Sequence, residues 1–373
     1  MSLEQQIDRL RKEIKSERLS MSIGELSGLY DRKEIDIHPK FQRILRWSGE
    51  QKTKLIESIL LRIPVPPVYV AQDALGKWDV VDGVQRLGTV FEFLGVLRDP
   101  DGQVRQPLVL RSTKLLPELE GYSFSSTPDA INSFGVPLQL DFRRSRIDVE
   151  IILKESDPST KYELFERLNT GGSMASDQEV RNCVLVWINE SLFDWVKGEL
   201  GNYEHFQKCV QLPERLEDLQ YRSELILRFL ALHQIEVDNL RGIKDLGEFL
   251  NEKNREIAVS EDFDRGSHER TFKETFRLLS EAVEGDAFRK FSKATNSFSG
   301  PFLISAFEAV TLGVASNIDQ WLALAPAKAK DLVSTRVKTL WDQASFVGHI
   351  GTGVSAQNRM QKSVPFGRQF FKP

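Results

Sequence analysis

One short stretch of the sequence combines the residue types that bind a phosphate. Residues 82–86 read Asp-Gly-Val-Gln-Arg and lie between a strand-like run at 78–81 and a helical pattern from about 87 to 97. Gly83 would let the backbone turn sharply and approach a ligand closely. The amides after it would be donors at the positive end of the helix dipole, which favours an anion. Arg86 would add a planar guanidinium that matches a phosphate.

Gly83 and Arg86 are therefore candidates for binding a phosphate, and Asp82 and Gln85 lie next to them in the sequence. Asp82 could also hold a Mg²⁺ ion that bridges phosphates. A plainer explanation stays open at this point. Asp-Gly is a common turn dipeptide, and Gln85 and Arg86 could simply face solvent.

A second polar stretch, residues 41–47, places a glutamine, two arginines and two aromatic rings just before a predicted helix. Gln42, Arg43, Arg46 and Trp47 are candidates for nucleotide binding, because such groups contact phosphates and stack on bases. The same residues could equally form a packed turn in which the arginine stems cover Trp47.

A third stretch joins two predicted helices through Gly171 and a capping box that begins at Ser176. A plain helix–loop–helix explains the glycines but not the polar residues gathered there. Asn169, Gly171 and Arg181 are therefore further nucleotide-binding candidates. We expect Arg43 and Asn169 to lie near Asp82 in space, because only a common pocket accounts for all three stretches.

The elements that would position these residues predict an α+β fold. Strands are expected at Ile35–Ile37, Val68–Val70, Trp78–Val81, Leu108–Leu110 and Ile147–Leu153, with helices at 49–61 and 87–97 between them. Strand signals fade after about residue 159, and long amphipathic helices follow. The expected organisation is an N-terminal helix at 1–19, a small mixed sheet with helices at 20–157, and a helical domain with a basic tail at 158–373.

Composition limits the function. The net charge of −4 over 373 residues argues against a uniformly basic nucleic-acid binder, so DNA contact would be local. Two basic groups are candidates for it, each with a packing or solvated alternative: Arg143, Arg144 and Arg146, and in the tail Arg359, Lys362 and Arg368. Two cysteines argue against a disulfide framework or zinc ribbon. With no transmembrane-length apolar run and a charged N-terminus, we expect a cytoplasmic protein without membrane contact.

Together the three polar stretches resemble the domain-of-unknown-function 262 family of the ParB/sulfiredoxin-like superfamily. The family's opening pattern resembles residues 41–48, its Asp-Gly-Gln-Gln-Arg-Leu hallmark resembles residues 82–87, and its later motif resembles residues 165–182. The resemblance covers about residues 20–185 and implies a ParB/sulfiredoxin-like nucleotide-binding domain. Val84 departs from the pattern, because the family usually has a glutamine there, which puts hydrolysis in doubt more than binding.

The resemblance also implies a role in prokaryotic DNA-directed defence, as in GmrSD-type modification-dependent restriction enzymes. The leading hypothesis that the resemblance implies is an NTP-binding and NTP-hydrolysing regulator, with an NTP and Mg²⁺ as cofactors. Its candidate catalytic residues would be Asp82, Gln85 and Arg86, and Gly83 would be a nucleotide-binding residue. The alternatives are a non-enzymatic module that binds DNA or senses its modification, and a scaffold for a separate nuclease. We identify no nuclease site in the helical half, where His349 is the only histidine of the last 100 residues. A separately encoded nuclease is therefore an expected partner. The helix predicted at 3–19 allows a homo-oligomer, although plain packing explains it as well.

Overall fold

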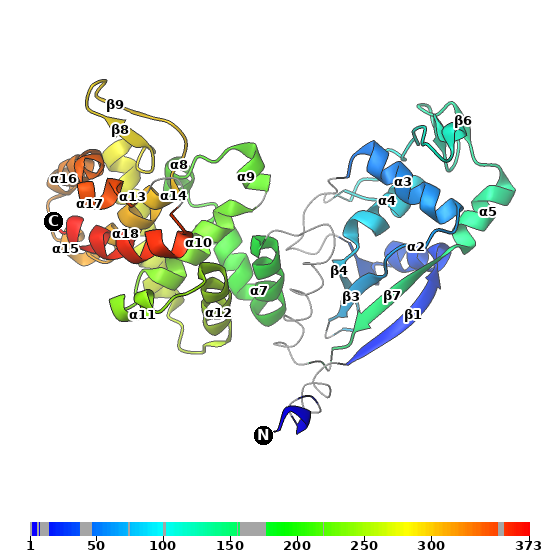
Figure 1. The fold of residues 1–373 in the computed structure, drawn as a ribbon, viewed down its shortest axis with the longest axis horizontal. Helices are drawn as coiled ribbons and strands as arrows, with labels where there is room; N and C mark the ends of the chain where they lie inside the picture. Colours follow the sequence, from blue (N-terminus) through cyan, green and yellow to red (C-terminus); the bar gives the residue numbers. More distant parts are fainter. Residues whose placement is uncertain are drawn as a thin grey trace. The chain divides into compact units, whose positions relative to one another are not determined.

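The chain folds into two compact units, residues 1–174 and 175–373, each with its own hydrophobic core (Figure 1). The computed structural model describes residues 2–5, 7, 15–37, 47–73, 75–99, 102–154, 156, 177–218, 220–349 and 354–373. The first unit is α+β and the second is helical, which confirms the predicted fold class. In the described part of the chain, no helix is both long and apolar enough to cross a membrane.

The first unit is built on a five-stranded mixed sheet in the order β1-β7-β3-β4-β2. Its strands are β1 (Ser16–Ser22), β2 (Ile35–Asp36), β3 (Val68–Gln72), β4 (Trp78–Asp82) and β7 (Arg146–Ile152). The β1–β7 and β3–β4 pairs are antiparallel, and the β3–β7 and β2–β4 pairs are parallel. Its remaining elements are α2 (Ile23–Asp31), α3 (Gly49–Leu60), α4 (Val84–Leu94), α5 (Val136–Arg144), the 3₁₀ turn η1 (Pro117–Leu119) and the short pair β5 (Tyr122–Ser123) and β6 (Asn132–Ser133).

Alternation along β7 shows how the sheet buries one face. Ile147, Val149 and Ile151 are buried in the core. Between them, Asp148 and Glu150 lie within 2.6 and 3.4 Å of the Arg18 guanidinium on β1. Successive side chains of a strand point to opposite faces, so this pattern places the apolar residues against the helices.

The helix starts follow the capping signals in the sequence. Ser22 caps α2 in a capping box with Glu25, and Ser48 caps α3 in the same way with Gln51. The predicted helix at 49–61 is thus confirmed nearly residue for residue. The helix after the Asp-Gly turn, α4, begins three residues earlier than predicted and ends at Gly95, whose φ of 75° suits a glycine.

Two predicted elements of the first unit are wrong. The helix expected over residues 3–19 does not reach its predicted end, because Ser16–Ser22 forms the edge strand β1, paired along its length with β7. Leu108–Leu110 is not a strand, although its backbone makes two hydrogen bonds that join Leu110 to Gly121 and Tyr122. Residues 8–14 lie outside the described part of the chain.

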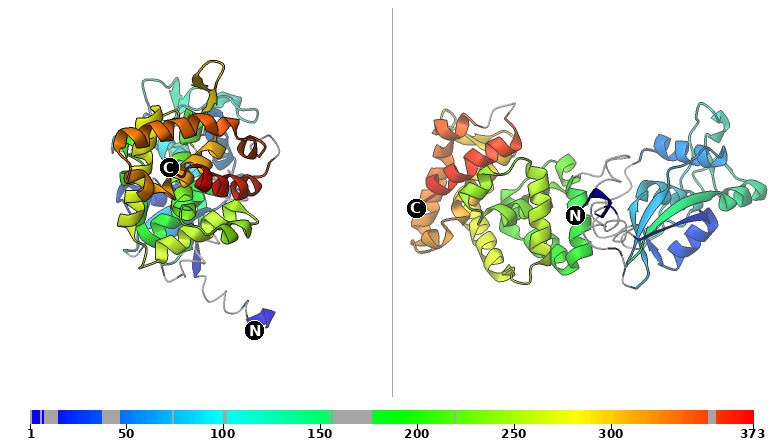
Figure 2. Two further views of the ribbon diagram at one scale, coloured as in Figure 1. Left: turned by 90° about the vertical axis from the view of Figure 1, so that its left-hand side faces the viewer. Right: turned by 60° about the horizontal axis from the view of Figure 1, so that its bottom comes forward.

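The second unit surrounds the buried helix α14 (Ile304–Ala315), whose residues 305–315 are all buried (Figure 2). Its other helices are α7 (Asp177–Asp194), α8 (Glu204–Cys209), α9 (Glu214–Asp218), α10 (Tyr221–Leu232), α11 (Val237–Arg241), α12 (Leu246–Val259), α13 (Arg265–Val283), α15 (Ile318–Leu322), α16 (Pro326–Thr339), α17 (Ala344–Val347) and α18 (Ala356–Phe370). A π-helical turn η2 (Trp195–Leu200), a 3₁₀ turn η3 (Leu340–Asp342) and a hairpin of β8 (Lys290–Ser292) and β9 (Ser297–Ser299) complete it.

The basic C-terminal segment forms the helix α18, which packs against the rest of the unit. If this segment packed at all, we expected a strand or a coil. Helix α18 packs against α14 through glycines: a Cβ added at Gly367 would overlap the carbonyl of Ala309, and one added at Gly313 would approach the Gly367 carbonyl to 2.5 Å. Close backbone approach of this kind needs residues without side chains. Trp321 donates a hydrogen bond of 2.9 Å to the carbonyl of Phe371 and holds the end of the chain.

Candidate functional site

The turn between β4 and α4 depends on Gly83. Its φ of 97° and ψ of 11° lie in the left-handed region, where residues with a Cβ are disfavoured. A Cβ at this position would also stand 2.9 Å from Cγ2 of Val68 and 3.1 Å from Nη2 of Arg86. The Arg86 guanidinium therefore lies directly against the Gly83 backbone, at the N-terminal end of α4.

Asp82 and Arg86 form an ion pair across this turn. Nη2 of Arg86 donates to Oδ2 of Asp82 at 2.8 Å and to the carbonyl of Pro67 at 3.0 Å. The Arg86 and Asp82 side chains are only 12% and 22% exposed. Nε of Arg86 is buried and has no acceptor among the described residues. A pair this far from water depends on good geometry to offset its desolvation, and here one guanidinium donor is left unsatisfied.

Tyr69 lies opposite Asp82 in the β3–β4 ladder, at a point where the register shifts by a bulge. Burial raises the pKa of the Tyr69 hydroxyl, and the carboxylates of Glu150 and Asp82 raise it further. The hydroxyl therefore stays protonated at neutral pH and can donate a hydrogen bond close to the Asp82 end of the turn.

Gln85 connects the turn to the start of α3. The backbone N–H of Trp47 donates to Oε1 of Gln85 at 3.2 Å, and the Trp47 ring packs against the sheet core. The hydroxyl of Thr89 donates to the Gln85 carbonyl at 2.7 Å. The structure thus brings Trp47 and Gln85 together, as a shared site would require, although they are far apart in sequence.

The burial of Val84 partly explains why a valine stands where the family pattern usually has a glutamine. Its side chain is 6% exposed and belongs to the core cluster of the sheet unit. A valine at the first position of α4 therefore adds apolar packing under the turn, while Gln85 and Arg86 carry the polar groups.

The described residues offer a magnesium ion one carboxylate at this turn, that of Asp82, and it is already paired with Arg86. In the part of the chain that the structure describes, no group of three or more His, Cys, Asp or Glu side chains could hold a metal ion. Asp82 alone does not fit a resident Mg²⁺ site. In this structure the Asp82 carboxylate accepts a hydrogen bond from the Arg86 guanidinium.

Several predicted site residues lie outside the described part of the chain, namely Gln42, Arg43, Arg46, Asn169 and Gly171. The expectation that Arg43 and Asn169 share a pocket with Asp82 therefore stays a prediction.

Arg181, expected to bind nucleotide, is buried inside the helical unit. Its Nε donates to Asn251 at 2.8 Å, its Nη1 donates to Gln178 at 2.9 Å, and Nη1 lies 3.7 Å from a carboxylate oxygen of Glu224. The side chain is 5% exposed. Neighbouring Asn182 donates to Gln220 at the start of α10. These contacts are structural, and they tie the polar end of the third stretch to the helical core.

The same network extends to the basic tail. Arg228 bridges Glu224 and the fully buried Glu308, with N–O distances of 2.5 and 2.6 Å. Arg359 donates to both carboxylate oxygens of Glu308 at 3.1 and 3.2 Å. The charge of Arg359 is therefore paired with a carboxylate inside the unit. This pairing corrects the prediction that Arg359 belongs to a nucleic-acid surface.

The remaining basic candidates differ in exposure. Arg368 donates to the carbonyls of Leu232, His233 and Ile235 at the end of α10, so it too has internal partners. Lys362 is exposed and lies 3.4 Å from Nδ1 of His349. The other three form a separate group: Arg143 and Arg144 end α5, Arg146 begins β7, and all are exposed.

Sequence reasoning missed two contributors to these sites. The Pro67 carbonyl, which accepts from Arg86, could not be identified because a backbone acceptor leaves no trace in the sequence. Glu308 had a signal: it is the only acidic residue in the apolar run 302–315. A lone carboxylate in such a run indicates a buried ion pair.

The first unit is thus an α+β domain with a strand–glycine–helix turn that presents an arginine at a helix N-terminus. Residues 26–186 match the family described as GmrSD restriction endonuclease, N-terminal domain. This part of the chain, somewhat less than half of it, is related to the N-terminal part of GmrSD-type restriction enzymes. Searches of curated proteins and of solved structures gave no match.

Proposed function

We propose that the protein is a nucleotide-binding, NTP-hydrolysing regulator of a restriction-type defence system. The family match to a restriction endonuclease domain supports the defence role. The observation that carries the nucleotide assignment is Arg86. Its guanidinium lies against Gly83 at the positive end of α4 and keeps a buried Nε without an acceptor among the described residues.

In this proposal a phosphate binds at the N-terminus of α4, between the helix amides and Arg86. Asp82 holds the guanidinium in place through the 2.8 Å ion pair, so Asp82 acts by positioning Arg86. Gln85 adjoins the nucleotide site and fixes the backbone of Trp47 beside it. Magnesium would arrive with the nucleotide phosphates, which supply most of its ligands in many NTP sites.

The test uses the purified full chain with Mg²⁺ and each NTP, measuring binding by calorimetry and turnover by phosphate release. Arg86→Lys is the sharpest variant, because a lysine keeps a positive charge beside Asp82 but loses the planar fork. We expect at least a tenfold loss of nucleotide affinity with an unchanged melting temperature. Arg62→Lys, at a side chain 80% exposed, is the matched control. Unchanged affinity in Arg86→Lys would show that the pocket lies elsewhere.

An alternative function is DNA binding without turnover, supported by the exposed Arg143, Arg144 and Arg146. Neutralising all three would then weaken DNA retention and flatten its salt dependence, while leaving nucleotide binding unchanged. Retention of DNA without any nucleotide binding would favour this alternative over the regulator.

We further propose a separately encoded nuclease as partner. The pure protein should then leave plasmid DNA intact with Mg²⁺ or Mn²⁺ and any NTP. Cleavage that persists through further purification would contradict this assignment and would point first to the region around His349.

A further inference from the structure

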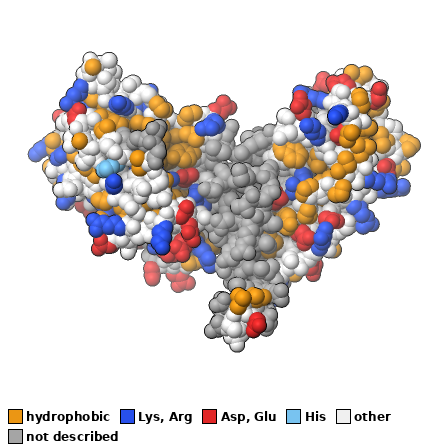
Figure 3. Space-filling model, in the orientation of Figure 1, with side chains coloured by type: hydrophobic (Ala, Val, Ile, Leu, Met, Phe, Trp, Pro, Cys, Tyr) orange, Lys and Arg blue, Asp and Glu red, His pale blue; other side chains and the backbone are white. Residues whose placement is uncertain are grey.

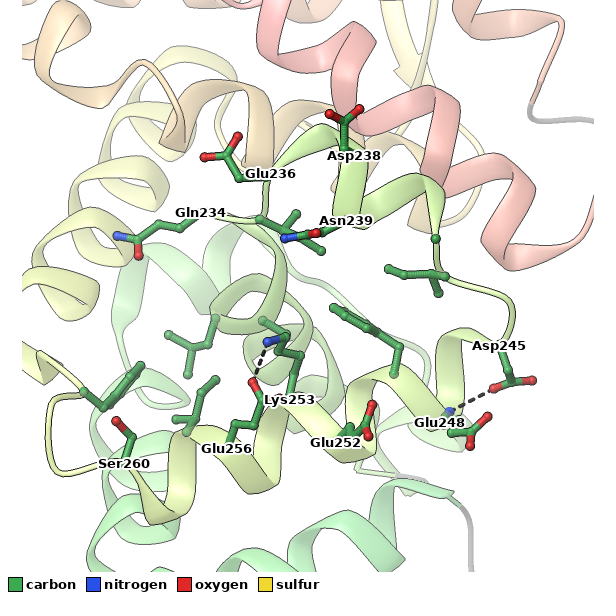
Figure 4. Close-up of a pocket in the computed structure, with 18 of the residues that line it drawn as sticks. Gln234, Glu236, Asp238, Asn239, Asp245, Glu248, Glu252, Lys253, Glu256 and Ser260 are labelled. Carbon is green, nitrogen blue, oxygen red and sulfur yellow. Dashed lines mark hydrogen bonds and ion pairs between the residues drawn. The ribbon is translucent and has the colours of Figure 1, made fainter.

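A cavity of about 990 Å³ opens on the helical unit between α11 and α12, outside the family-matched residues 26–186 (Figure 4). Its walls come from the end of α10, from α11 and the loop 242–245, and from one face of α12. None of the residues assigned above to nucleotide or DNA binding lines it.

The floor of this α11–α12 groove is apolar. Leu230, Ile235 and Ile243 contribute buried side chains, and Phe249 and Ile257 on α12 are partly buried, packed against the core. Phe249 and Ile257 are eight residues apart and therefore lie on the same face of α12. The groove thus offers a row of apolar groups that water can reach.

The rim of the groove is acidic. Six carboxylates face two ammonium groups there, a formal difference of −4, which equals the net charge of the whole chain. The acids are Glu236, Asp238, Asp245, Glu248, Glu252 and Glu256, and the lysines are Lys244 and Lys253. Figure 4 shows the acids of α12 along one side and Glu236 and Asp238 on the opposite side, and in Figure 3 acidic side chains gather over this part of the unit.

Internal partners offset only part of this charge. Lys253 forms an ion pair with Glu256. Asp238 lies 3.5 Å from Arg241, and both of these side chains are exposed. His268 lines one end, and burial lowers its pKa, so its ring is uncharged at neutral pH and adds no opposing cation.

We propose that the α11–α12 groove binds a basic amphipathic helix of a partner protein. The apolar stripe of such a helix would cover the apolar floor, and its lysine or arginine stems would reach the carboxylates on both sides. An anionic partner is disfavoured by the same charge, so nucleic acid is excluded here. The proposal is independent of nucleotide binding at Arg86.

The probe is a labelled synthetic helical peptide with leucines at i, i+3, i+4 and i+7 and lysines elsewhere, titrated with the full chain by fluorescence anisotropy. A peptide with the same leucines and glutamates in place of the lysines is the first control. We expect binding of the lysine peptide, weakened by added salt, and none of the glutamate peptide.

Two matched double variants locate the site. Glu252→Lys with Glu256→Lys reverses the rim and should weaken binding at least tenfold. Glu204→Lys with Glu281→Lys reverses two exposed acids elsewhere in the same unit and should change it less than twofold. Phe249→Ala should weaken binding without changing charge, and Ile257→Ala serves the same purpose if Phe249→Ala lowers the melting temperature.

Equal losses in the two double variants would overturn the proposal, because binding would then reflect only the overall charge. Unchanged binding in both apolar variants would overturn it as well. A labelled DNA duplex, titrated without the peptide, should not bind here, and an affinity for DNA that Phe249→Ala weakens would mean that the groove accepts an anion, contrary to the charge argument.

Discussion

At the scale of single residues, the Asp82–Arg86 ion pair changes the role that we propose for Asp82, while the turn stays the candidate phosphate site. Asp82 ends β4 and Arg86 lies in the first turn of α4, and the sequence suggested a separate ligand for each side chain. The structure has the two side chains bound to each other at 2.8 Å. Asp82 thereby changes from a candidate metal ligand to the group that orients Arg86.

Gly83 yields a prediction that separates backbone strain from steric contact. Gly83→Ala forces a Cβ into a left-handed turn and within 2.9 Å of Val68, and it also displaces Arg86. Gly102 has a similar φ of 81°, but nothing lies within 4 Å of an added Cβ. Strain alone costs about 1–2 kcal/mol, so Gly102→Ala should stay in that range and Gly83→Ala should exceed it by about 2 kcal/mol.

Urea denaturation of both variants measures this difference. Similar unfolding free energies for Gly83→Ala and Gly102→Ala would mean that the contact with Val68 relaxes easily and that Gly83 is required only for its conformation.

At the scale of elements, the sequence predicted those that carry their own signals. Capping residues and apolar periodicity were enough for α3, β3 and β4. The edge strand β1 has no such signal: its residues read Ser-Glu-Arg-Leu-Ser-Met-Ser, and most are exposed because only β7 pairs with it. Pairing with a distant strand decides its conformation, and that partner cannot be read from local sequence.

Helices α5 and α18 escaped prediction for a related reason. Both contain a proline, Pro137 at the start of α5 and Pro365 inside α18, and both have a polar composition. A proline such as Pro365 normally destabilises the interior of a helix. Packing of Gly367 against α14 supplies the stabilisation that local propensity lacks.

The buried network around α14 predicts a large effect from one neutral substitution. Glu308 is 0% exposed and is the shared partner of Arg228 and Arg359. Glu308→Gln would remove the charge partner of Arg359 and would leave Arg228 paired with Glu224 alone, and breaking a buried pair in this way costs about 3–5 kcal/mol. Glu204→Gln, at the exposed pair with Lys208, should change the stability far less, because solvent screens that pair.

Chemical denaturation of the helical unit would measure both variants. If Glu308→Gln unfolds at the same urea concentration as the wild type, the network contributes little, and Arg228 and Arg359 must find other acceptors.

His233, at the end of α10, predicts a pH dependence of stability. Burial lowers the pKa of His233 to about 4, helped by neighbouring His268, whereas an unfolded histidine titrates near 6.5. The unfolded chain therefore binds the proton first as the pH falls. Stability from this group is complete above about pH 6.5 and declines by about 3 kcal/mol as the pH approaches 4.

Thermal unfolding between pH 4 and 7 compares the wild type with His233→Gln. The slope of stability against pH should be smaller in the variant, since glutamine does not titrate. Parallel curves for the two proteins would contradict the buried neutral state of His233.

At the scale of the whole molecule, the boundary between the units does not coincide with the end of the family-matched segment. The match ends at residue 186, inside α7, whereas the second unit begins at residue 175. The residues predicted to bind the nucleotide likewise belong to both units. Its turn at residues 82–86 lies in the sheet unit, and Arg181 is buried in the helical one. The sequence could predict which polar residues are candidates for the site, but not which of the two units would bury each of them.

This boundary predicts how the chain can be cut. Residues 175–373 keep all of α7, including Leu185 in the core and Arg181 with its bonds to Asn251 and Gln178. A fragment starting at residue 187, immediately after the family match, loses these contacts, together with the approach of Arg181 to Glu224. Burial of Leu185 alone is worth about 2–3 kcal/mol, and the lost hydrogen bonds of Arg181 add to the loss.

We therefore expect the 175–373 fragment to melt cooperatively by circular dichroism, and the 187–373 fragment to melt at a much lower temperature or not to fold. Arg181→Met in the longer fragment separates the two causes, because it keeps the apolar packing of α7 and removes only the polar contacts. Its melting temperature should lie between those of the two fragments. Equal melting temperatures for the 175–373 and 187–373 fragments would mean that the first ten residues of α7 contribute little to the stability of the helical unit.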